Sequence, residues 1–287
     1  MTYLVGSPGS CGEFIQGYAE GSSLMVACPI NRYSYVKIER GISIHSLPAK
    51  AEAACRNCLK YLQISDDHFN IQLYSEILKG KGLASSTADI SSAVQAIALI
   101  NGRVLTEEEI ADLAISIEPS DATFFKGMVQ FDYRNGRLLK RLGVCPPMQI
   151  LIYDCGGEID TMQFNSRKDL VELQKMNEPK IQEALDLFNL GIKEQSLDWI
   201  GRAASISAFA NQKILYKKQL EPFYQIGIAL GGKGVICAHS GTVLGLILPA
   251  EMQAGPVKQE IDRAMGNEIR FLDLVHVINS GLTYRRL

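Results

Sequence analysis

The first half of the chain is dominated by short segments in which apolar and polar residues alternate, a pattern typical of β-strands with one face turned to a core. Apolar positions spaced three and four residues apart predict helices between these segments. The residues 134–136, Arg-Asn-Gly, carry the chemistry of a hairpin turn. Thr106 and Glu109 form a capping box at the start of one helix. The expected strands are 13–19, 24–30, 32–39, 70–76, 128–133, 137–142 and 149–154, and the expected helices are 49–63, 85–101 and 107–116.

Beyond residue 160 the spacing of the apolar positions becomes mainly helical. We expect helices over 166–175, 179–192, 197–216 and 257–265, and strands over 235–238, 242–248 and 269–277. This order of elements predicts a mixed α+β protein. We expect a first domain over residues 1–160 and a second, smaller domain over residues 161–287.

Composition and charge exclude several classes of protein. Of the 287 residues, 47% are apolar and 21% are charged, which is ordinary for a globular protein and unlike a disordered chain. The 29 basic and 31 acidic residues give a net charge of −2, so no overall field favours nucleic acid or anionic lipid as a partner. No apolar run approaches the ~18–20 residues that a membrane span needs, and the first residues lack a signal-peptide pattern. We therefore expect a cytoplasmic protein without a nucleic-acid or membrane partner, its oligomeric state left open.

The cysteines favour reduced thiols over a disulfide framework, because the 7 of them are an odd number scattered along the chain. Cys55 and Cys58 form a CxxC motif on the apolar face of the helix predicted over 49–63. Two interpretations stay open: small buried side chains, which we favour, or half of a zinc site. A zinc site would need a second ligand pair, and the chain has no second CxxC or HxxxH motif.

The most informative stretch is 80–89, Gly-Lys-Gly-Leu-Ala-Ser-Ser-Thr-Ala-Asp, which leads into the helix predicted over 85–101. Its glycines allow the backbone to approach a ligand closely. A helix N-terminus presents unpaired N–H groups and a positive dipole end, and a hydroxyl there can bind a Mg²⁺ that also binds phosphates. The residues alone leave a second interpretation open: a flexible loop in which Ser85, Ser86 or Thr87 caps the helix.

A second glycine-rich stretch, 227–234, approaches the phosphate-binding pattern G-x-x-x-x-G-K-[ST] without completing it. Gly234 stands where the Mg²⁺-binding Ser or Thr would be. The stretch also follows a helical pattern, whereas that phosphate-binding loop follows a strand. We therefore expect a glycine-rich turn that ends a helix.

The stretch 82–87, Gly-Leu-Ala-Ser-Ser-Thr, resembles the second signature G-L-[GSA]-S-S-[AT] of the GHMP kinases, which are named for galactokinase, homoserine kinase, mevalonate kinase and phosphomevalonate kinase. Other stretches resemble the L-threonine kinase branch of this family, which makes O-phospho-L-threonine for the aminopropanol linker of cobalamin. These stretches are 8–17, 28–33, 118–121 and 238–241. The resemblance spans residues 6–248. It implies an α+β GHMP kinase fold, with an N-terminal domain like ribosomal protein S5 domain 2 and a C-terminal ferredoxin-like domain.

The resemblance also implies ATP and Mg²⁺ as cofactors. Phosphates would lie against backbone N–H groups of the loop, and the expected phosphate-binding residues are Lys81, Gly82, Leu83, Ala84, Ser85, Ser86 and Thr87. For Mg²⁺ we expect the Ser86 hydroxyl, with Ser85 as the alternative, and the Glu118 carboxylate, with Asp89 as the second carboxylate candidate. An acid near a helix start also favours the helix dipole without any further role, so this alternative stays open for Asp89. A solvated surface lysine stays the alternative for Lys81.

The candidate catalytic residue is Asp121, which would accept the proton of the substrate hydroxyl. Many GHMP kinases carry this aspartate in Pro-Ser-Gly-x-Asp, whereas here 119–121 reads Pro-Ser-Asp. Glu13 would pair with a substrate ammonium, and Arg32 is the nearest cation for a substrate carboxylate. The expected substrate contacts are Ser10, Glu13, Gln16, Arg32, His239, Ser240 and Gly241. The alternatives are a turn aspartate at 121, an exposed strand glutamate at 13 and a plain hairpin turn over 238–242.

The activity implied by the resemblance is transfer of a phosphoryl group from ATP to the hydroxyl of L-threonine, which gives O-phospho-L-threonine and ADP. One alternative is a GHMP kinase for another small hydroxyl substrate such as homoserine. The other is a non-catalytic GHMP-fold protein that binds a nucleotide or small molecule. The intact stretch 82–87 favours a kinase over the last of these.

Overall fold

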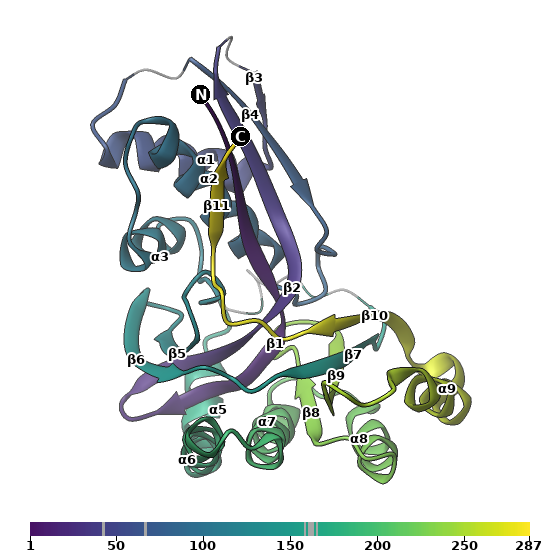
Figure 1. The fold of residues 1–287 in the computed structure, drawn as a ribbon. Coiled ribbons are helices and arrows are strands. Elements are labelled where there is room, and N and C mark those ends of the chain that lie inside the picture. The colour runs from purple at the N-terminus through teal and green to yellow at the C-terminus, as the bar shows by residue number, and fades with distance from the viewer. Residues whose placement is uncertain (42–43, 66–67, 158, 160–163, 165) are drawn as a thin grey trace.

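The strands of the protein belong to one 11-stranded sheet in the computed structural model, which describes residues 1–41, 44–65, 68–157, 159, 164 and 166–287. The main path of the sheet runs β10-β7-β9-β8-β1-β2-β4-β3, with β11 beside β1 and the hairpin β5–β6 beside β2 (Figure 1). The strands are β1 (Thr2–Ala19), β2 (Ser22–Arg40), β3 (Ile44–Ser46), β4 (Phe69–Ser75), β5 (Met128–Asp132), β6 (Arg137–Gly143), β7 (Met148–Asp154), β8 (Gly234–Cys237), β9 (Val243–Pro249), β10 (Arg270–His276) and β11 (Thr283–Arg286).

The helices form two groups, and together with the sheet they confirm the predicted α+β class (Figure 1). The first group lies beside the long strands and consists of α1 (Ala49–Tyr61), α2 (Ser85–Ile100) and α3 (Glu107–Ile115). The second group lies along the lower end of the sheet and consists of α5 (Leu170–Met176), α6 (Glu178–Glu194), α7 (Leu197–Ala210), α8 (Leu220–Ala229) and α9 (Ala254–Met265). The predicted division between residues 160 and 161 falls outside the described residues and stays a prediction.

Strand β1 is longer than predicted, because the sequence analysis placed its start at residue 13 and the strand begins at Thr2. The strand includes glycine or proline at positions 6, 8, 9 and 12, which the structure accommodates as irregularities within the strand. The pairing register with β2 shifts three times between Pro8 and Ile15. Strand β2 is likewise continuous from Ser22 to Arg40, where two strands were expected.

The bulged part of β1 is where the two halves of the chain meet. Glu13 pairs with Ala27 of β2 and also with Cys237 of β8. Gly12 has a φ of +58°, and a Cβ there would stand 2.8 Å from the Cys237 carbonyl oxygen. Strand β11, which was not predicted, adds to the other end of β1, and Leu287 N donates to Thr2 O at 3.0 Å, so the chain ends lie together.

Helix α2 is the central helix of the first group, and every residue from Thr87 to Ile100 is buried. It packs against β1 and β2 on one side and against α1 and α3 on the other. A helix buried all round has no polar stripe. Its interior serines instead bond to their own helix: Ser91 Oγ donates to Thr87 O and Ser92 Oγ to Ala88 O, both at 2.7 Å.

Several local predictions are confirmed. The capping box of Thr106 and Glu109 is present at the start of α3. The turn at 134–136 joins β5 to β6, with Gly136 at a φ of +70°. The stretch 227–234 ends α8, and Gly231 has a φ of +89° in the turn that follows. Cys55 and Cys58 are buried in α1, as expected of small core side chains.

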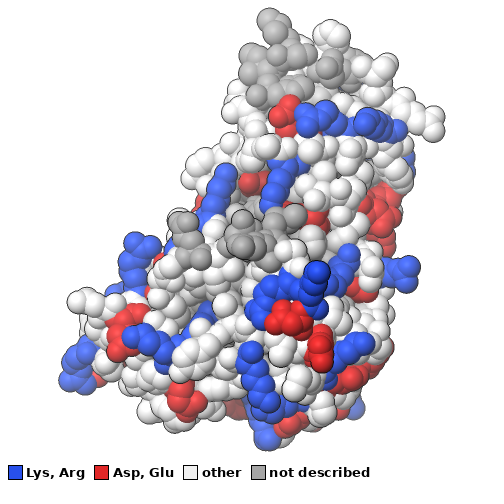
Figure 2. Space-filling model, turned by 180° about the vertical axis from the view of Figure 1, so that it is seen from behind, with Lys and Arg blue, Asp and Glu red and all other residues white. Residues whose placement is uncertain are grey.

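The described residues show no group of three or more His, Cys, Asp or Glu side chains placed to hold a metal ion. Within the same residues, no helix is both long enough and apolar enough to cross a bilayer. On the face shown in Figure 2, basic and acidic side chains are interspersed.

Helix α7 packs on the sheet through two glycines. A Cβ added at Gly201 would stand 2.0 Å from the Lys233 carbonyl oxygen, and one added at Gly234 would stand 2.1 Å from the Gly201 carbonyl oxygen. Both contacts are with backbone, which cannot rotate away as a side chain can. The helix therefore approaches β8 closely because neither position carries a side chain.

We predict that Gly201→Ala lowers the free energy of unfolding by about 1–3 kcal/mol, since the added methyl group forces α7 away from β8. Urea denaturation measures this change. The matched control is Gly255→Ala in α9, where a Cβ meets nothing within 4 Å. That variant should be about 0.4–1 kcal/mol more stable than the parent. An equal change in the free energy of unfolding in the two variants would show that the close contact between α7 and β8 does not require glycine at position 201.

Candidate active site

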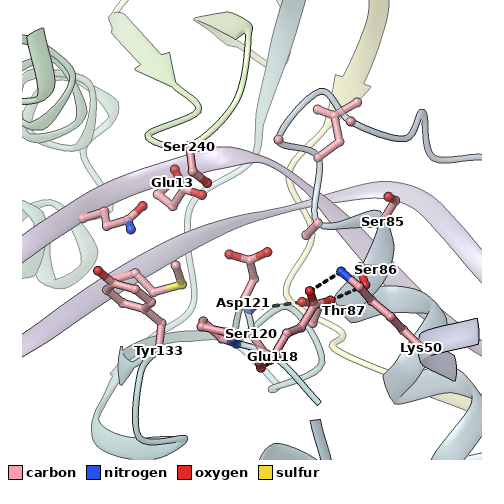
Figure 3. Close-up of a pocket in the computed structure, with 17 residues that line it drawn as sticks. Glu13, Lys50, Ser85, Ser86, Thr87, Glu118, Ser120, Asp121, Tyr133 and Ser240 are labelled. Atoms are coloured by element: carbon pink, nitrogen blue, oxygen red, sulfur yellow. Dashed lines mark hydrogen bonds and ion pairs between the residues drawn. The ribbon is translucent and has the colours of Figure 1, made fainter. Parts of the chain in front are cut away.

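A cavity of about 260 Å³ lies between the loop before α2 and the bulged part of β1 (Figure 3). Its wall is assembled from segments that are distant in the sequence: β1, β2, the start of α1, the loop 80–87, the segment after α3, and the turns after β5 and β8. The lining residues are Glu13, Gln16, Met25, Lys50, Gly80, Gly82, Leu83, Ala84, Ser85, Ser86, Thr87, Glu118, Pro119, Ser120, Asp121, Tyr133 and Ser240.

The loop before α2 has an unusual backbone that only a few residue types adopt. Gly80, Gly82 and Ala84 have φ angles of +71°, +83° and +56°, in the left-handed region. At Gly82 a Cβ would also stand 2.5 Å from the Cβ of Ala238. Glycine at position 82 is therefore required both by its backbone angle and by the neighbouring turn.

Helix α2 starts at Ser85 without a side-chain cap, which corrects the expectation that Ser85, Ser86 or Thr87 caps it. The N-cap residue is Ala84, which has no oxygen to offer. The hydroxyls of Ser86 and Thr87 bond instead to a segment that approaches from after α3. The first amide groups of α2 are thus left without side-chain acceptors beside the cavity, an arrangement that suits an anion such as phosphate.

The segment 118–121 is held against the start of α2 by two hydroxyl groups. Ser86 Oγ donates to Glu118 Oε1, and Thr87 Oγ1 accepts a hydrogen bond from Asp121 N at 3.2 Å (Figure 3). Ser120 N donates to Tyr133 O at 3.3 Å on the other side. These contacts place the carboxylates of Glu118 and Asp121 on the cavity wall.

Lys50 is a site residue that the sequence analysis missed. It lies in the first turn of α1, and its Nζ is 2.5 Å from Glu118 Oε2. Glu118 therefore bonds to Lys50 with one oxygen and to Ser86 with the other. No local pattern marks Lys50, because its partner is 68 residues away in the chain.

The cavity is rich in negative charge. Glu13, Glu118 and Asp121 line it, and Lys50 is the one basic residue among the lining residues that the structure describes. Burial and, to a smaller extent, the nearby carboxylates of Glu13 and Glu118 together raise the pKa of Asp121 to about 8. A ligand that brings positive charge would therefore be favoured here.

Asp89 and Lys81 were expected near the phosphates, but neither lines this cavity. Asp89 lies on a neighbouring cavity of about 270 Å³, which shares Lys50, Ser85 and Ser86 with the first. Its Oδ1 accepts a hydrogen bond from Ser34 Oγ at 2.6 Å, and burial raises its pKa. Lys81 instead forms an ion pair of 2.9 Å with Asp154 at the end of β7.

Arg32 and Ser10 were expected to contact the substrate, and the structure places both outside the lining. Arg32 Nε and Nη2 donate to the two oxygens of Asp273 in β10 at 2.7 and 2.9 Å. Ser10 lies behind the loop, where its N donates to Leu83 O at 3.0 Å. Its buried hydroxyl has no hydrogen-bond partner among the described residues.

The turn between β8 and β9 contributes less to the lining than expected. Ser240 lines the cavity, but His239 is buried behind Glu13 and Gly241 packs against the loop. A Cβ at Gly241 would stand 2.6 Å from the Cα of Gly82. The turn therefore supports the cavity wall more than it forms it.

Comparison with known proteins places this geometry in a family. Residues 49–127 match the family described as GHMP kinases N terminal domain. An L-threonine kinase of Citrobacter freundii is 31% identical over 245 residues, which cover 84% of this chain and 84% of that protein. An L-threonine kinase of Salmonella typhimurium is 31% identical over 246 residues, covering 84% and 81%. The chain belongs to the GHMP kinase family.

Solved structures of other GHMP kinases share the fold, as the resemblance implied. A homoserine kinase from Cytophaga hutchinsonii has a TM-score of 0.71 at 17% identity, covering 99% of this chain and 97% of that chain. A mevalonate kinase has a TM-score of 0.69 at 15% identity, covering 96% and 99%. The family match and the two relatives show that this GHMP kinase is a phosphotransferase that acts on a hydroxyl group of a small molecule.

We predict that Asp121→Asn stabilises this GHMP kinase by an amount that grows between about pH 5 and pH 8. An aspartate in the unfolded chain has a pKa of about 3.9. Between that pH and the folded-state pKa of about 8, Asp121 is protonated in the folded protein and ionised in the unfolded chain. The free energy of unfolding therefore falls as the pH rises through this range. An amide cannot ionise and escapes this loss. Thermal unfolding across the range measures the difference.

The control for this pH dependence is Asp154→Asn. Burial alone would raise the pKa of Asp154, but hydrogen bonds from Thr242 and Lys81 hold it below its ordinary value. Its stabilising effect is complete above the unfolded pKa and is lost only as the pH falls below it. Asp154→Asn should therefore lose the same amount of stability at every pH in this range. The same pH dependence in both variants would contradict the raised pKa of Asp121.

Proposed function

We propose that this GHMP kinase transfers the γ-phosphoryl group of ATP to the hydroxyl of L-threonine, giving O-phospho-L-threonine and ADP. The observation that carries the proposal is the charge of the cavity, where Glu13, Glu118 and Asp121 face one cation, Lys50. An amino acid brings an ammonium group and Mg²⁺ brings two positive charges, so both would offset these carboxylates. Mevalonate has a carboxylate but no ammonium group, so it carries no positive charge to offset the carboxylates of the cavity. The two relatives called L-threonine kinase support the same choice.

The phosphates of ATP would lie at the start of α2. The amide groups of Gly82 to Ser86 present donors there, and the helix dipole favours negative charge. Ser85, Ser86 and Lys50 line both cavities, so a nucleotide in one could reach an acceptor in the other. A solved complex of MDDEF with MVAPP, AMPPCP and magnesium shares the fold, with a TM-score of 0.73 at 9% identity.

Ser86 and Glu118 would hold Mg²⁺. Their oxygens already meet in the structure, and hydroxyl and carboxylate oxygens are the ligands that Mg²⁺ prefers. Two protein ligands are enough, since Mg²⁺ at kinase sites takes its other ligands from phosphates and water. Asp89 is the less suitable carboxylate, because Ser34 occupies one of its oxygens on the far side of Ser86.

Asp121 would accept the proton of the threonine hydroxyl. Its raised pKa keeps it mostly protonated near pH 7 in the empty cavity. Binding of Mg²⁺ and of the substrate ammonium would favour the ionised form, because nearby positive charge lowers the pKa of a carboxyl group. The base would thus form when both substrates are present.

Glu13 would bind the substrate ammonium, while Met25 and Tyr133 form an apolar part of the same wall. The hydroxyl of Tyr133 is already bonded to Gln174, at 3.1 Å from its Nε2, so the ring is what faces a ligand. This surface suits the methyl group of threonine, which serine lacks. The product would feed the aminopropanol linker of cobalamin, in the cytoplasm.

We predict that L-threonine gives the highest kcat/KM in an ADP-release assay with Mg²⁺ and ATP. L-Serine should be poorer by about 10- to 200-fold, the usual discrimination for one methyl group. L-Homoserine and mevalonate complete the comparison. Absence of stimulation by millimolar L-threonine would overturn the proposal, and a preference for homoserine would establish the alternative acceptor.

We also predict that Asp121→Asn lowers kcat by about 10²–10⁴-fold, the usual contribution of a general base. Ser86→Ala should raise the Mg²⁺ concentration needed for half-maximal rate, because a metal ligand is lost. Glu260→Gln on the exposed face of α9 serves as the control, since Glu260 pairs only with Arg263 among the described residues. Full activity of both site variants would refute the assigned roles.

A further inference from the structure

A chain of buried polar groups lies behind the cavity wall and joins Glu13 to α7. Glu13 Oε2 accepts hydrogen bonds from His239 N and His239 Nδ1, both at 3.0 Å. On the opposite side of the ring, His239 Nε2 is 3.0 Å from Ser207 Oγ. Ser207 Oγ in turn accepts a hydrogen bond from Gln16 N at 3.1 Å, so the chain returns to β1.

Among the described residues, His239 is the one hydrogen-bond partner of the Glu13 carboxylate. Its backbone lies between two register shifts of β1 and follows Gly12, which has a φ of +58°. Only 5% of Glu13 and 3% of His239 are exposed, so water cannot replace the contact between them. His239 occupies Oε2, which leaves Oε1 as the free oxygen of a carboxylate that lines the cavity.

We propose that His239 is the positioning residue for Glu13: it fixes Oε2 so that Oε1 receives the ammonium group of the amino-acid substrate. This inference rests on the proposed function, because Glu13 acts on an ammonium only if the acceptor is an amino acid. His239 does not touch the substrate.

The charges around His239 favour its protonated form. Burial lowers the pKa of His239, but Cys237 and Glu13 outweigh burial and raise it to about 10. Lys217, on the segment after α7, donates to Ala238 O at 2.8 Å and supports the same turn. The side chains that face the imidazole are thus Glu13 from β1, Cys237 from β8 and Ser207 from α7.

The turn that carries His239 also touches the phosphate loop. Gly241 packs against Gly82, and Thr242 N donates to Lys81 O at 3.2 Å. One short turn therefore fixes the ammonium anchor on one side and the phosphate loop on the other. The backbone of 238–242 sets the distance between Glu13 and the loop before α2. This distance in turn limits the length of the substrate that can bind between them.

Two substitutions separate the donors of the imidazole ring. His239→Asn keeps an amide N–H near the place of Nδ1 and should retain the bond to Glu13. His239→Gln places its amide nearer to Nε2, so it keeps the contact with Ser207 and loses the side-chain bond to Glu13. The bond from the backbone N–H of residue 239 to Glu13 remains in both variants. We expect His239→Gln to raise the KM for L-threonine about tenfold or more, the loss of one hydrogen bond to a charged group. The KM for ATP and the kcat at saturating L-threonine should change less than threefold, and His239→Asn should resemble the parent.

A double-mutant cycle distinguishes positioning from a general structural role. Glu13→Gln alone should raise the KM for L-threonine, and adding His239→Gln should raise it no further, because both changes remove one interaction. A structural role would make the two effects add. Ser207→Ala is the milder variant in case His239→Gln does not fold, and it should raise the same KM about threefold.

The outcomes separate this inference from the proposed function. Failure of the parent enzyme to use L-threonine would overturn both. Parent activity on L-threonine with an unchanged KM in His239→Gln, equal damage in the Asn and Gln variants, or additive effects in the cycle would overturn the role of His239 alone. If only Ser207→Ala can be measured, an unchanged KM would overturn that role.

Discussion

The close contact between two backbone turns is the constraint on which the site depends. Gly82 precedes α2, and Gly241 lies between β8 and β9; neither could carry a side chain without parting the two turns. A hydrogen bond from Thr242 N to Lys81 O and the ion pair of Lys81 with Asp154 hold the same junction. The contact fixes the start of α2 relative to the sheet, and the start of α2 is where the phosphates would lie.

The second important feature is the charge of the cavity. Contacts at the start of α2 and at the turn 238–242 place the charged side chains there. The hydroxyls of α2 hold the segment 118–121 instead of capping their own helix, which brings two carboxylates to the cavity. Glu13 enters from the bulged β1, anchored from behind by His239. Lys50 offsets only part of this charge. A cavity built this way has most to gain from ligands that carry ammonium groups and metal ions.

Irregular backbone is present on two sides of the site. The shifts in β1 between Pro8 and Ile15 lie beside the turn of 238–242 and let one strand pair with both β2 and β8. Left-handed angles at Gly80, Gly82 and Ala84 aim the loop at the cavity. Backbone of this kind persists only where surrounding contacts hold it, and here those contacts come from the other half of the chain.

The sequence by itself determined the elements that depend on near neighbours. The spacing of apolar residues predicted α2 and α3, and short motifs predicted the capping box at Thr106 and the hairpin at 134–136. Each of these features depends on residues a few positions apart. The stretch 82–87 also indicated the GHMP kinase family. Only the tertiary structure decided which charges meet: Lys50 with Glu118, Lys81 with Asp154, Arg32 with Asp273 and Glu13 with His239. These partners lie 68 to 241 residues apart, and a distance in space between such residues is set by the packing of the whole sheet, which no local pattern records.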